Sequence, residues 1–216
     1  MQLNMEGRYH WIVFLPSTMN EEVPVLNRYY GVFESGKIKV RGIEAARRDA
    51  PPLIGKAQRD MIKVLAKASN SEMFVKKIPE AIEVLRGHVE RLRRRDVDVR
   101  DLIITKQLSM HPDRYAHDVF QTIAANQLMK EGMEISARQT VRYLITDAEN
   151  RRPNKRVKAV ELINAETQFD VKKYLDLLML AGVNVLSPFG YTEERLKDYI
   201  VYEAKQSELE PLLITT

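Results

Sequence analysis

The sequence predicts an α+β fold, in which a small antiparallel sheet at the N-terminal end is followed by a mainly helical region with one short β-hairpin. Two observations lead to this fold class. Apolar and polar side chains alternate along residues 29–41 across a Ser35-Gly36 turn, which is the pattern of an antiparallel hairpin. After Pro52, apolar side chains recur at the spacing of helices that pack one face against a core.

The first expected strand is Tyr9–Leu15, which is rich in aromatic and β-branched residues and ends at Pro16. Trp11, Val13 and Leu15 lie on one face of this strand and are apolar, and so are Ile12 and Phe14 on the opposite face. A strand that is apolar on both faces needs cover on both sides. Either another polypeptide completes this sheet or the chain's own helices cover it, and the pattern alone favours neither.

The remaining elements follow from periodicity and from capping residues. Pro51-Pro52 opens a helix with an apolar stripe, and Asn70-Ser71 caps the next one, in which Pro79 should cause a break or a kink. Further along we expect a second stripe from Ile82 to Leu92 and an extended segment at 102–109. A helix should run from Pro112 to about Glu131, with Tyr115 and Val119 on its buried face and Gly132 as its cap. Strands at 140–146 and 156–162 and a helix that starts near Phe169-Asp170 complete the expected elements.

The composition limits the classes of function. The chain has 216 residues, enough for one medium domain or two small ones, and 44% are hydrophobic, so wholesale disorder is not expected. The absence of cysteine excludes disulfides and thiolate metal sites, and the four histidines are scattered. No secretory segment or membrane-spanning apolar run is found, so the sequence predicts a cytoplasmic protein without membrane contact.

Basic side chains gather in one short segment although the net charge is only +4. Gly42 lies in the same segment, and a glycine lets another molecule approach the backbone closely. A polyanion is the natural partner of such a surface. A second basic run, Arg93–Arg95, is either a solvated helix end or a phosphate contact. The residues of the first segment are Arg28, Lys37, Lys39, Arg41, Arg47 and Arg48.

The stretch RGIEAARRD at residues 41–49, followed by Ala-Pro-Pro, resembles the RGxExxRRDxP stretch of family B DNA polymerases, especially archaeal ones. Tyr29 stands where that family has the tyrosine that closes a Lys-Lys-Arg-Tyr motif, although Leu26 and Asn27 replace its two lysines. A weaker resemblance covers nearly the whole chain. The family motifs that carry the metal-binding aspartates and the nucleotide-binding lysine are not found. The resemblance therefore implies the last palm strands at 1–52, a thumb at 53–200 and a tail at 201–216.

The resemblance also implies a set of residues that bind primer–template DNA. Asp49 is expected to pair with an arginine and to orient it. Gln121 replaces the histidine that archaeal relatives often have, and a tyrosine on an apolar stripe, such as Tyr115, is more often core than ligand. The full set is Asn27, Arg28, Tyr29, Arg41, Gly42, Arg47, Arg48, Asp49, Lys106, Tyr115 and Gln121.

No catalytic residue or metal ligand is assigned to this chain. Glu6 aligns with a family acid near the catalytic carboxylates, but a lone glutamate before a strand is more often solvated surface. Mg²⁺ is therefore expected in the active site of a partner, and no cofactor is expected on this chain.

The tail contains a pattern that resembles the sliding-clamp-binding box. The glutamine would enter a polar pocket and the leucines an apolar one, and the missing aromatic residues imply a modest affinity. The four residues are Gln206, Leu209, Leu212 and Leu213.

Two functions account for these features. The chain is either the small subunit of a split DNA-directed DNA polymerase or a non-catalytic accessory protein that binds DNA or the clamp. In the first case, a large subunit supplies the exonuclease, the fingers and the catalytic palm, and the small chain is inactive alone. We favour the first because residues that grip a primer are useful only beside an active site.

Overall fold

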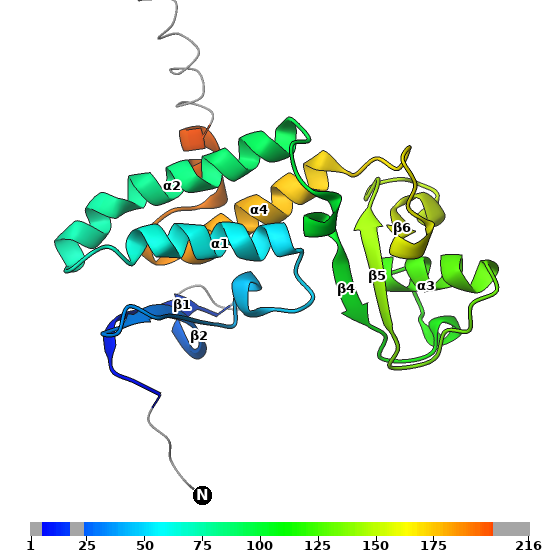
Figure 1. Cartoon of the computed structure of the whole chain (residues 1–216), viewed down its shortest axis with the longest axis horizontal. Coiled ribbons are helices and arrows are strands. Elements are labelled where there is room, and N and C mark those ends of the chain that lie inside the picture. Colours follow the sequence, from blue (N-terminus) through cyan, green and yellow to red (C-terminus); the bar gives the residue numbers. More distant parts are fainter. Residues whose placement is uncertain (1–5, 18–23, 201–216) are drawn as a thin grey trace, which may run out of the picture. The chain divides into compact units, whose positions relative to one another are not determined.

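The computed structural model describes residues 6–17 and 24–200, and it has the α+β class that the sequence predicts (Figure 1). These residues form two compact units, each of which is described by itself. The first unit is built from residues up to 47, 54–90 and 178 onward, and the second from residues 48–53 and 91–177.

The first unit begins with a three-stranded antiparallel sheet. Its strands are β1 (Tyr9–Pro16), β2 (Pro24–Phe33) and β3 (Ile38–Arg41), which lie side by side in that order. The expected turn connects β2 to β3, and its Gly36 has φ +80° and donates its N–H to the carbonyl oxygen of Phe33. The hairpin prediction is confirmed, although β2 is longer than the alternation indicated.

Three helices contribute to the first unit: α1 (Pro52–Leu65), α2 (Ser71–Arg93) and the second half of α4 (Val171–Leu186). The apolar stripes predicted for α1 and α2 are confirmed, because nearly all of their members are buried. The buried members are Ile54, Ala57, Met61, Leu65, Ala68, Ile82, Leu85, Val89 and Leu92, whereas Val64 is half-buried.

Helix α2 begins and continues for local reasons. Its predicted N-cap is confirmed, since Oδ1 of Asn70 accepts a hydrogen bond from the N–H of Met73 at 2.8 Å. Helix α2 runs through Pro79 without a break, although a break was one of the two outcomes expected there. Ile78 and Ala81 are both buried, so tertiary packing holds the helix where a proline removes one hydrogen bond.

One face of the sheet is covered by these helices. Tyr30 is fully buried, and its hydroxyl donates to the carbonyl oxygen of Val185 in α4 at 2.9 Å. The ring of Trp11 packs edge-on against Phe74 of α2, with the ring centroids 5.1 Å apart. Figure 1 shows α1, α2 and α4 on the same side of the strands. In the described part of the chain no helix covers the other face, where Phe14 is 39% exposed.

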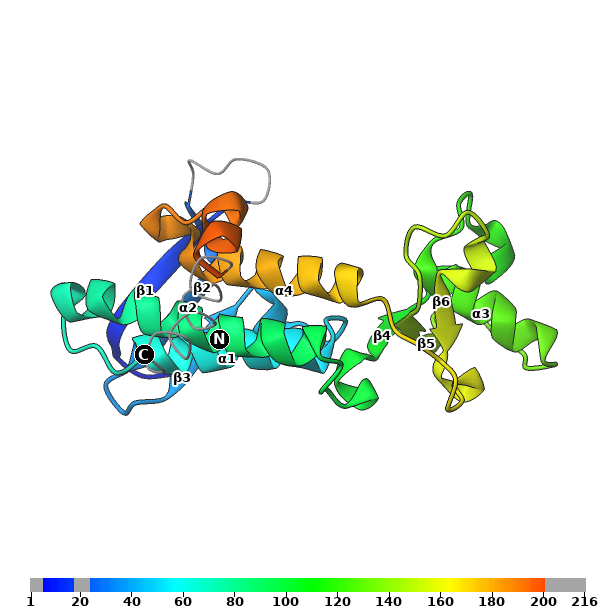
Figure 2. The ribbon, with the colours of Figure 1, turned by 90° about the horizontal axis from the view of Figure 1, so that it is seen from above.

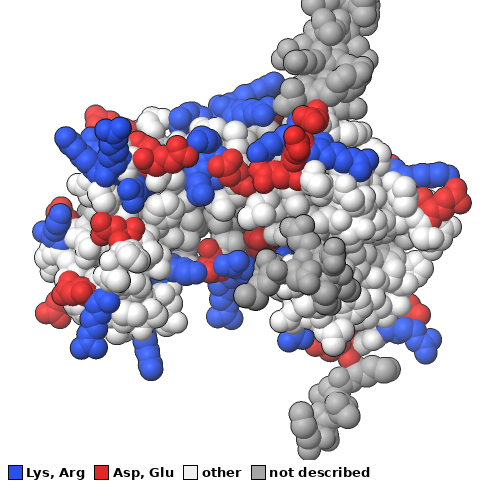
Figure 3. All heavy atoms as spheres, turned by 180° about the vertical axis from the view of Figure 1, so that it is seen from behind, with Lys and Arg blue, Asp and Glu red and all other residues white. Residues whose placement is uncertain are grey.

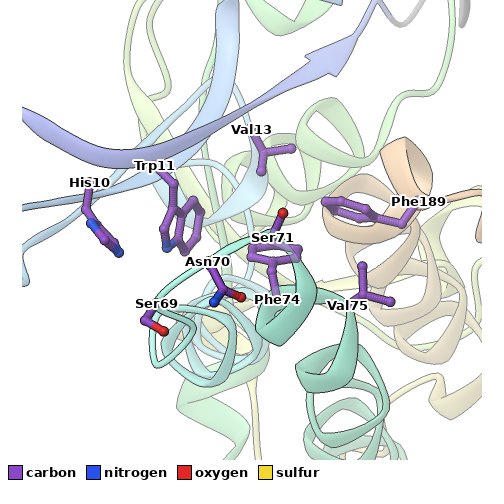
Figure 4. A pocket seen from close by; sticks show the side chains of 9 residues that line it. All are labelled: His10, Trp11, Val13, Ser69, Asn70, Ser71, Phe74, Val75 and Phe189. Atoms are coloured by element: carbon purple, nitrogen blue, oxygen red, sulfur yellow. The ribbon is translucent and has the colours of Figure 1, made fainter.

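An apolar hollow of about 350 Å³ lies between β1, the start of α2 and the turn Ser187–Phe189 (Figure 4). The rings of Trp11, Phe74 and Phe189 line it, and the centroids of the two phenylalanine rings are 4.9 Å apart. Its lining includes no lysine or arginine, so the hollow offers no positive charge to a phosphate group.

A helical segment, Glu193–Ile200, ends the described part of the first unit. Together with Val171–Phe189 it reaches the length and composition of a membrane span, but the two are bent by 110° relative to each other. Within residues 6–17 and 24–200, no single helix is long and apolar enough to cross a bilayer.

The second unit contains another antiparallel sheet, formed by β4 (Ile104–Gln107), β5 (Thr140–Ile145) and β6 (Val157–Ala159). Helix α3 (Phe120–Lys130) lies against β5 and β6 (Figure 2). The side-chain amide of Gln127 in α3 binds the edge of β6, donating to Val157 O and accepting from Ala159 N, both at 2.8 Å. A side chain thus takes the place of a further strand at this edge.

Two element boundaries in this unit differ from those predicted. Helix α3 begins at Phe120 and not at Pro112, so Tyr115 and Val119 lie outside it. The hydroxyl of Tyr115 instead binds Ser109, and Pro112–Arg114 forms a short 3-10 helix. Strand β6 has three residues, and the apolar residues after it form a 3-10 turn, because a short apolar run does not by itself distinguish strand from turn. The cap at Gly132 is confirmed by its φ of +84°.

Candidate nucleic-acid interface

The uncovered face of the first sheet carries both aromatic and basic side chains. In the strand register Tyr29 lies opposite Arg41, and Gly31 lies opposite Lys39. Phe14 of β1 also lies opposite Tyr29. Because residues directly opposite each other share a face, these side chains project from the face that the helices leave open.

The aromatic part of this face is held together by direct contacts. The hydroxyl of Tyr9 donates to the hydroxyl of Tyr29 at 3.5 Å, and the ring of Tyr9 stacks on Phe33 with centroids 4.4 Å apart. Burial, and then the hydrogen bond with Tyr29, raise the pKa of Tyr9 to about 12, so this hydroxyl stays protonated near neutral pH. Gly31 allows the contact, since a Cβ there would come within 3.1 Å of the Tyr9 ring.

Glu6 lies at the same face and forms an ion pair there. Its carboxylate is 2.7 Å from Nζ of Lys39, and this contact lowers the pKa of Glu6 and raises the pKa of Lys39. Within the described ranges, no group of three histidine, aspartate or glutamate side chains is arranged to hold a metal ion. A single carboxylate that is already paired with a lysine does not fit the pair of metal ions used in phosphoryl transfer.

Arg28 is held by three acceptors of the protein itself. Its guanidinium donates to Pro16 O at 2.6 Å, to Oδ1 of Asn184 at 3.1 Å and to Gly42 O at 3.3 Å. Gly42 has φ +70°, and a Cβ at this position would overlap the carbonyl oxygen of Asn27. The positive φ and this close approach restrict the backbone of the loop that follows β3, in which Arg41 and Arg47 are exposed.

In the second unit, Lys106 of β4 forms an ion pair with Asp49 at 2.5 Å. Lys106, another of the predicted DNA-binding residues, is thus one partner of Asp49. Both line an open, polar hollow of about 450 Å³ together with Arg48, Thr105, Gln107 and Thr140. This set of one carboxylate, two cations and several hydrogen-bond donors suits a phosphate oxygen or a sugar hydroxyl.

Charge elsewhere is arranged differently. On α2, Lys76 pairs with Glu72 at 2.7 Å, and Arg86 pairs with Glu83 and Glu90. Figure 3 shows acidic side chains interspersed with basic ones over the face that it presents. Such paired charges reduce the attraction of this part of α2 for a polyanion.

Residues 26–189 match the family model of DNA polymerase family B. The chain belongs to this family. It is 30% identical to DNA polymerase 2 of Aeropyrum pernix over 79% of its own length and 20% of the relative, and 26% identical to DNA polymerase 1 of Saccharolobus solfataricus over 91% of its own length and 21% of the relative.

A solved structure supports the same fold. The family B DNA polymerase from Pyrobaculum calidifontis superimposes with a TM-score of 0.66 over 88% of this chain and 23% of that chain, at 21% identity. The chain spans about a fifth of the length of these family B relatives.

The structure groups the predicted DNA-binding residues of this family B chain in different ways. Arg48, Asp49 and Lys106 line one hollow, from which Tyr115 and Gln121 are absent. The hydroxyl of Tyr115 accepts from the N–H of Ser109 at 2.8 Å, and hydrogen bonding with Ser109 lowers the pKa of Tyr115. The four clamp-box residues, Gln206, Leu209, Leu212 and Leu213, lie outside the described residues.

Sequence reasoning did not find three residues that support the loop between Arg41 and Arg47, which we call the arginine loop. Gln58 and Asn184, which lie far apart in the chain, both donate hydrogen bonds to the carboxylate of Glu44. Gln58 gave a weak signal, because it is a polar residue directly after Ala57 on the buried side of a helix. Asn184 gave none, since half-buried asparagines are common in helices that pack on a sheet.

Proposed function

We propose that this chain is the small subunit of a split family B DNA-directed DNA polymerase. It binds primer–template DNA and positions it for a large subunit that carries the exonuclease, the fingers and the catalytic aspartates with their Mg²⁺. One observation carries the proposal: the open face of β1–β3 presents Tyr29, Lys39 and Arg41 together. Such a face can hold a nucleic-acid backbone, and the metal ligands for synthesis are proposed to lie on the large subunit.

The proposed role of this chain is to position the primer–template duplex. Cationic side chains such as Arg41 and Arg48 contact phosphates without reading sequence, so they fix the register of the duplex. The catalytic aspartates of the large subunit would hold Mg²⁺, which would supply the charge stabilisation that phosphoryl transfer needs. Holding the primer end correctly matters for the rate, because a shift of about 1 Å can cost about 10²-fold.

Other parts of the hypothesis belong to the same proposal. The palm strands at 1–52, the thumb at 53–200 and the tail at 201–216 are the boundaries that the family resemblance implies. A sliding clamp is a further partner if Gln206 and the leucines after it bind its pocket. The large subunit would complete the sheet along a strand edge, so that the open face remains available to the DNA.

Primer extension tests the proposal. The full chain, a large subunit that carries the family's catalytic motifs, and their mixture are each given a labelled primer–template and Mg²⁺. We expect no extension by the chain alone and much faster extension by the mixture than by the large subunit alone. Equal rates with and without the chain would contradict the proposal, and DNA binding retained in that case would favour an accessory protein.

The salt dependence of DNA binding tests the phosphate contacts. Arg41→Ala and Arg48→Ala should each weaken binding of the mixture to primer–template, to a similar extent for all sequences. Each should also reduce the slope of log K against log salt by about 1, because one fewer counterion is released.

The matched control is Arg195→Ala, which removes the same charge from a guanidinium that lies 4.4 Å from the Tyr191 ring centroid and binds Gly190 O. Its salt slope should equal that of the unchanged protein. Slopes that stay the same in the Arg41 and Arg48 variants would show that these residues do not contact phosphates.

A further inference from the structure

Two side-chain amides connect the arginine loop of the first unit to its helices. Gln58 of α1 is fully buried, and its Oε1 accepts from the backbone N–H of Ala45 at 2.7 Å. Its Nε2 donates to a carboxylate oxygen of Glu44 at 2.6 Å and to Ala181 O of α4 at 3.0 Å. The turn that begins at Glu44 is therefore joined to both helices through one residue.

Asn184 of α4 makes the second connection. Its Nδ2 donates to both carboxylate oxygens of Glu44, at 2.9 and 3.1 Å. Its Oδ1 accepts from the guanidinium of Arg28 at 3.1 Å. An amide has an acceptor on one side and donors on the other, so Asn184 satisfies a cation and an anion at once, and only one orientation of the amide does so.

The network fixes the loop between Arg41 and Arg47. Arg28 holds its start through Gly42 O, and Glu44 holds its centre through the two amides. A half-buried guanidinium or carboxylate is destabilised when it loses a hydrogen-bond partner. Arg28 and Glu44 therefore favour the loop conformation in which both of them reach Asn184.

We infer that Asn184 is a positioning residue for DNA binding, which acts through Arg28 and Glu44 on the loop that carries Arg41 and Arg47. Arg28 then belongs to the support of this loop and not to the surface that touches phosphate. This inference rests on the proposed function. It goes beyond it by placing the control of the primer contact in α4, on a residue that carries no charge.

Hydrogen exchange tests the inference without DNA. In Asn184→Ala, backbone amides of residues 43–47 should exchange faster, with Ala45 the most affected. Asn184→Asp keeps the size of the side chain and the acceptor for Arg28 but loses the donors to Glu44, so the same amides should also exchange faster. Unchanged exchange in both variants would overturn the inference.

DNA binding by the mixture with the large subunit provides the second readout. Asn184→Ala should raise Kd on the order of ten-fold, as expected for the loss of hydrogen bonds to charged groups. The salt slope should stay unchanged, because no charge is lost from the interface. The effect should disappear when Arg41 and Arg47 are both alanine, because the loop then has no side chain to position.

A stability-matched control separates positioning from general loosening. Asn70→Ala removes the N-cap of α2 and should lower the melting temperature without changing Kd or the exchange of residues 43–47. If Asn70→Ala changed both readouts as Asn184→Ala does, the inference would be wrong. A mixture that binds no DNA at all while the exchange result holds would refute the proposed function and leave the loop support established.

Discussion

Gly42→Ala should destabilise the first unit by about 2–4 kcal/mol. Alanine in the left-handed region costs roughly 1–2 kcal/mol, and the added Cβ would also overlap the carbonyl oxygen of Asn27 in the neighbouring strand. The backbone must shift to relieve this overlap, and that shift would also disturb the hydrogen bond from Arg28 to Gly42 O. Urea unfolding followed by circular dichroism measures the loss.

Gly36→Ala is the matched control for this change. Gly36 also has a positive φ, of +80°, but a Cβ there would meet nothing within 4 Å. Gly36→Ala should cost only the free energy of placing alanine at a positive φ, about 1 kcal/mol. Equal losses at the two positions would show that the approach of Asn27 to Gly42 is not close in solution.

Tyr174→Phe should destabilise the second unit by about 2–4 kcal/mol. The hydroxyl of Tyr174 is fully buried, donates to Leu102 O at 2.8 Å and accepts from Ile145 N at 3.0 Å. Phenylalanine keeps the ring but leaves a buried carbonyl and a buried N–H without their partner, and each costs about 1–3 kcal/mol. Tyr30→Phe is the control, since it removes one such bond, to Val185 O, and should cost roughly half as much.

The same residue makes stability depend on alkaline pH. Burial raises the pKa of Tyr174 well above the ordinary value for a tyrosine. Above about pH 10 the unfolded chain loses this proton while the folded chain keeps it, so the free energy of unfolding falls as pH rises, by about 1.4 kcal/mol per pH unit for one proton. Tyr174→Phe should reduce this slope by one proton, and an unchanged slope between pH 10 and 11 would contradict the buried position.

Local patterns predicted much of the fold for a physical reason. Alternation from Tyr29 to Arg41 gave the hairpin, and the helical stripes gave most of the buried residues of α1 and α2, because side-chain direction follows directly from backbone period. The start of α3 was placed too early, since the contact from Tyr115 to Ser109 depends on a turn and not on a period.

The candidate site was predicted less completely. Sequence clustering singled out Arg28 among the basic residues of its segment, but it did not indicate the hydrogen bond from its guanidinium to Asn184, 156 residues away in the chain. The pairing of Asp49 with Lys106 joins residues 57 positions apart, and no pattern between them indicates it. Sequence reasoning identified which charges are grouped along the chain but not which partners the fold gives them.

By itself the sequence determined the α+β class, the two-sided first strand, the resemblance to family B polymerases and the basic character of the segment around Gly42. Only the tertiary structure decided which face of the first sheet stays open, and that Arg28 and Glu44 are tied to α4. The reason is that periodicity states how many sides of an element are apolar. Which side receives a helix, and which charge receives a partner, depends on segments that meet only when the chain folds.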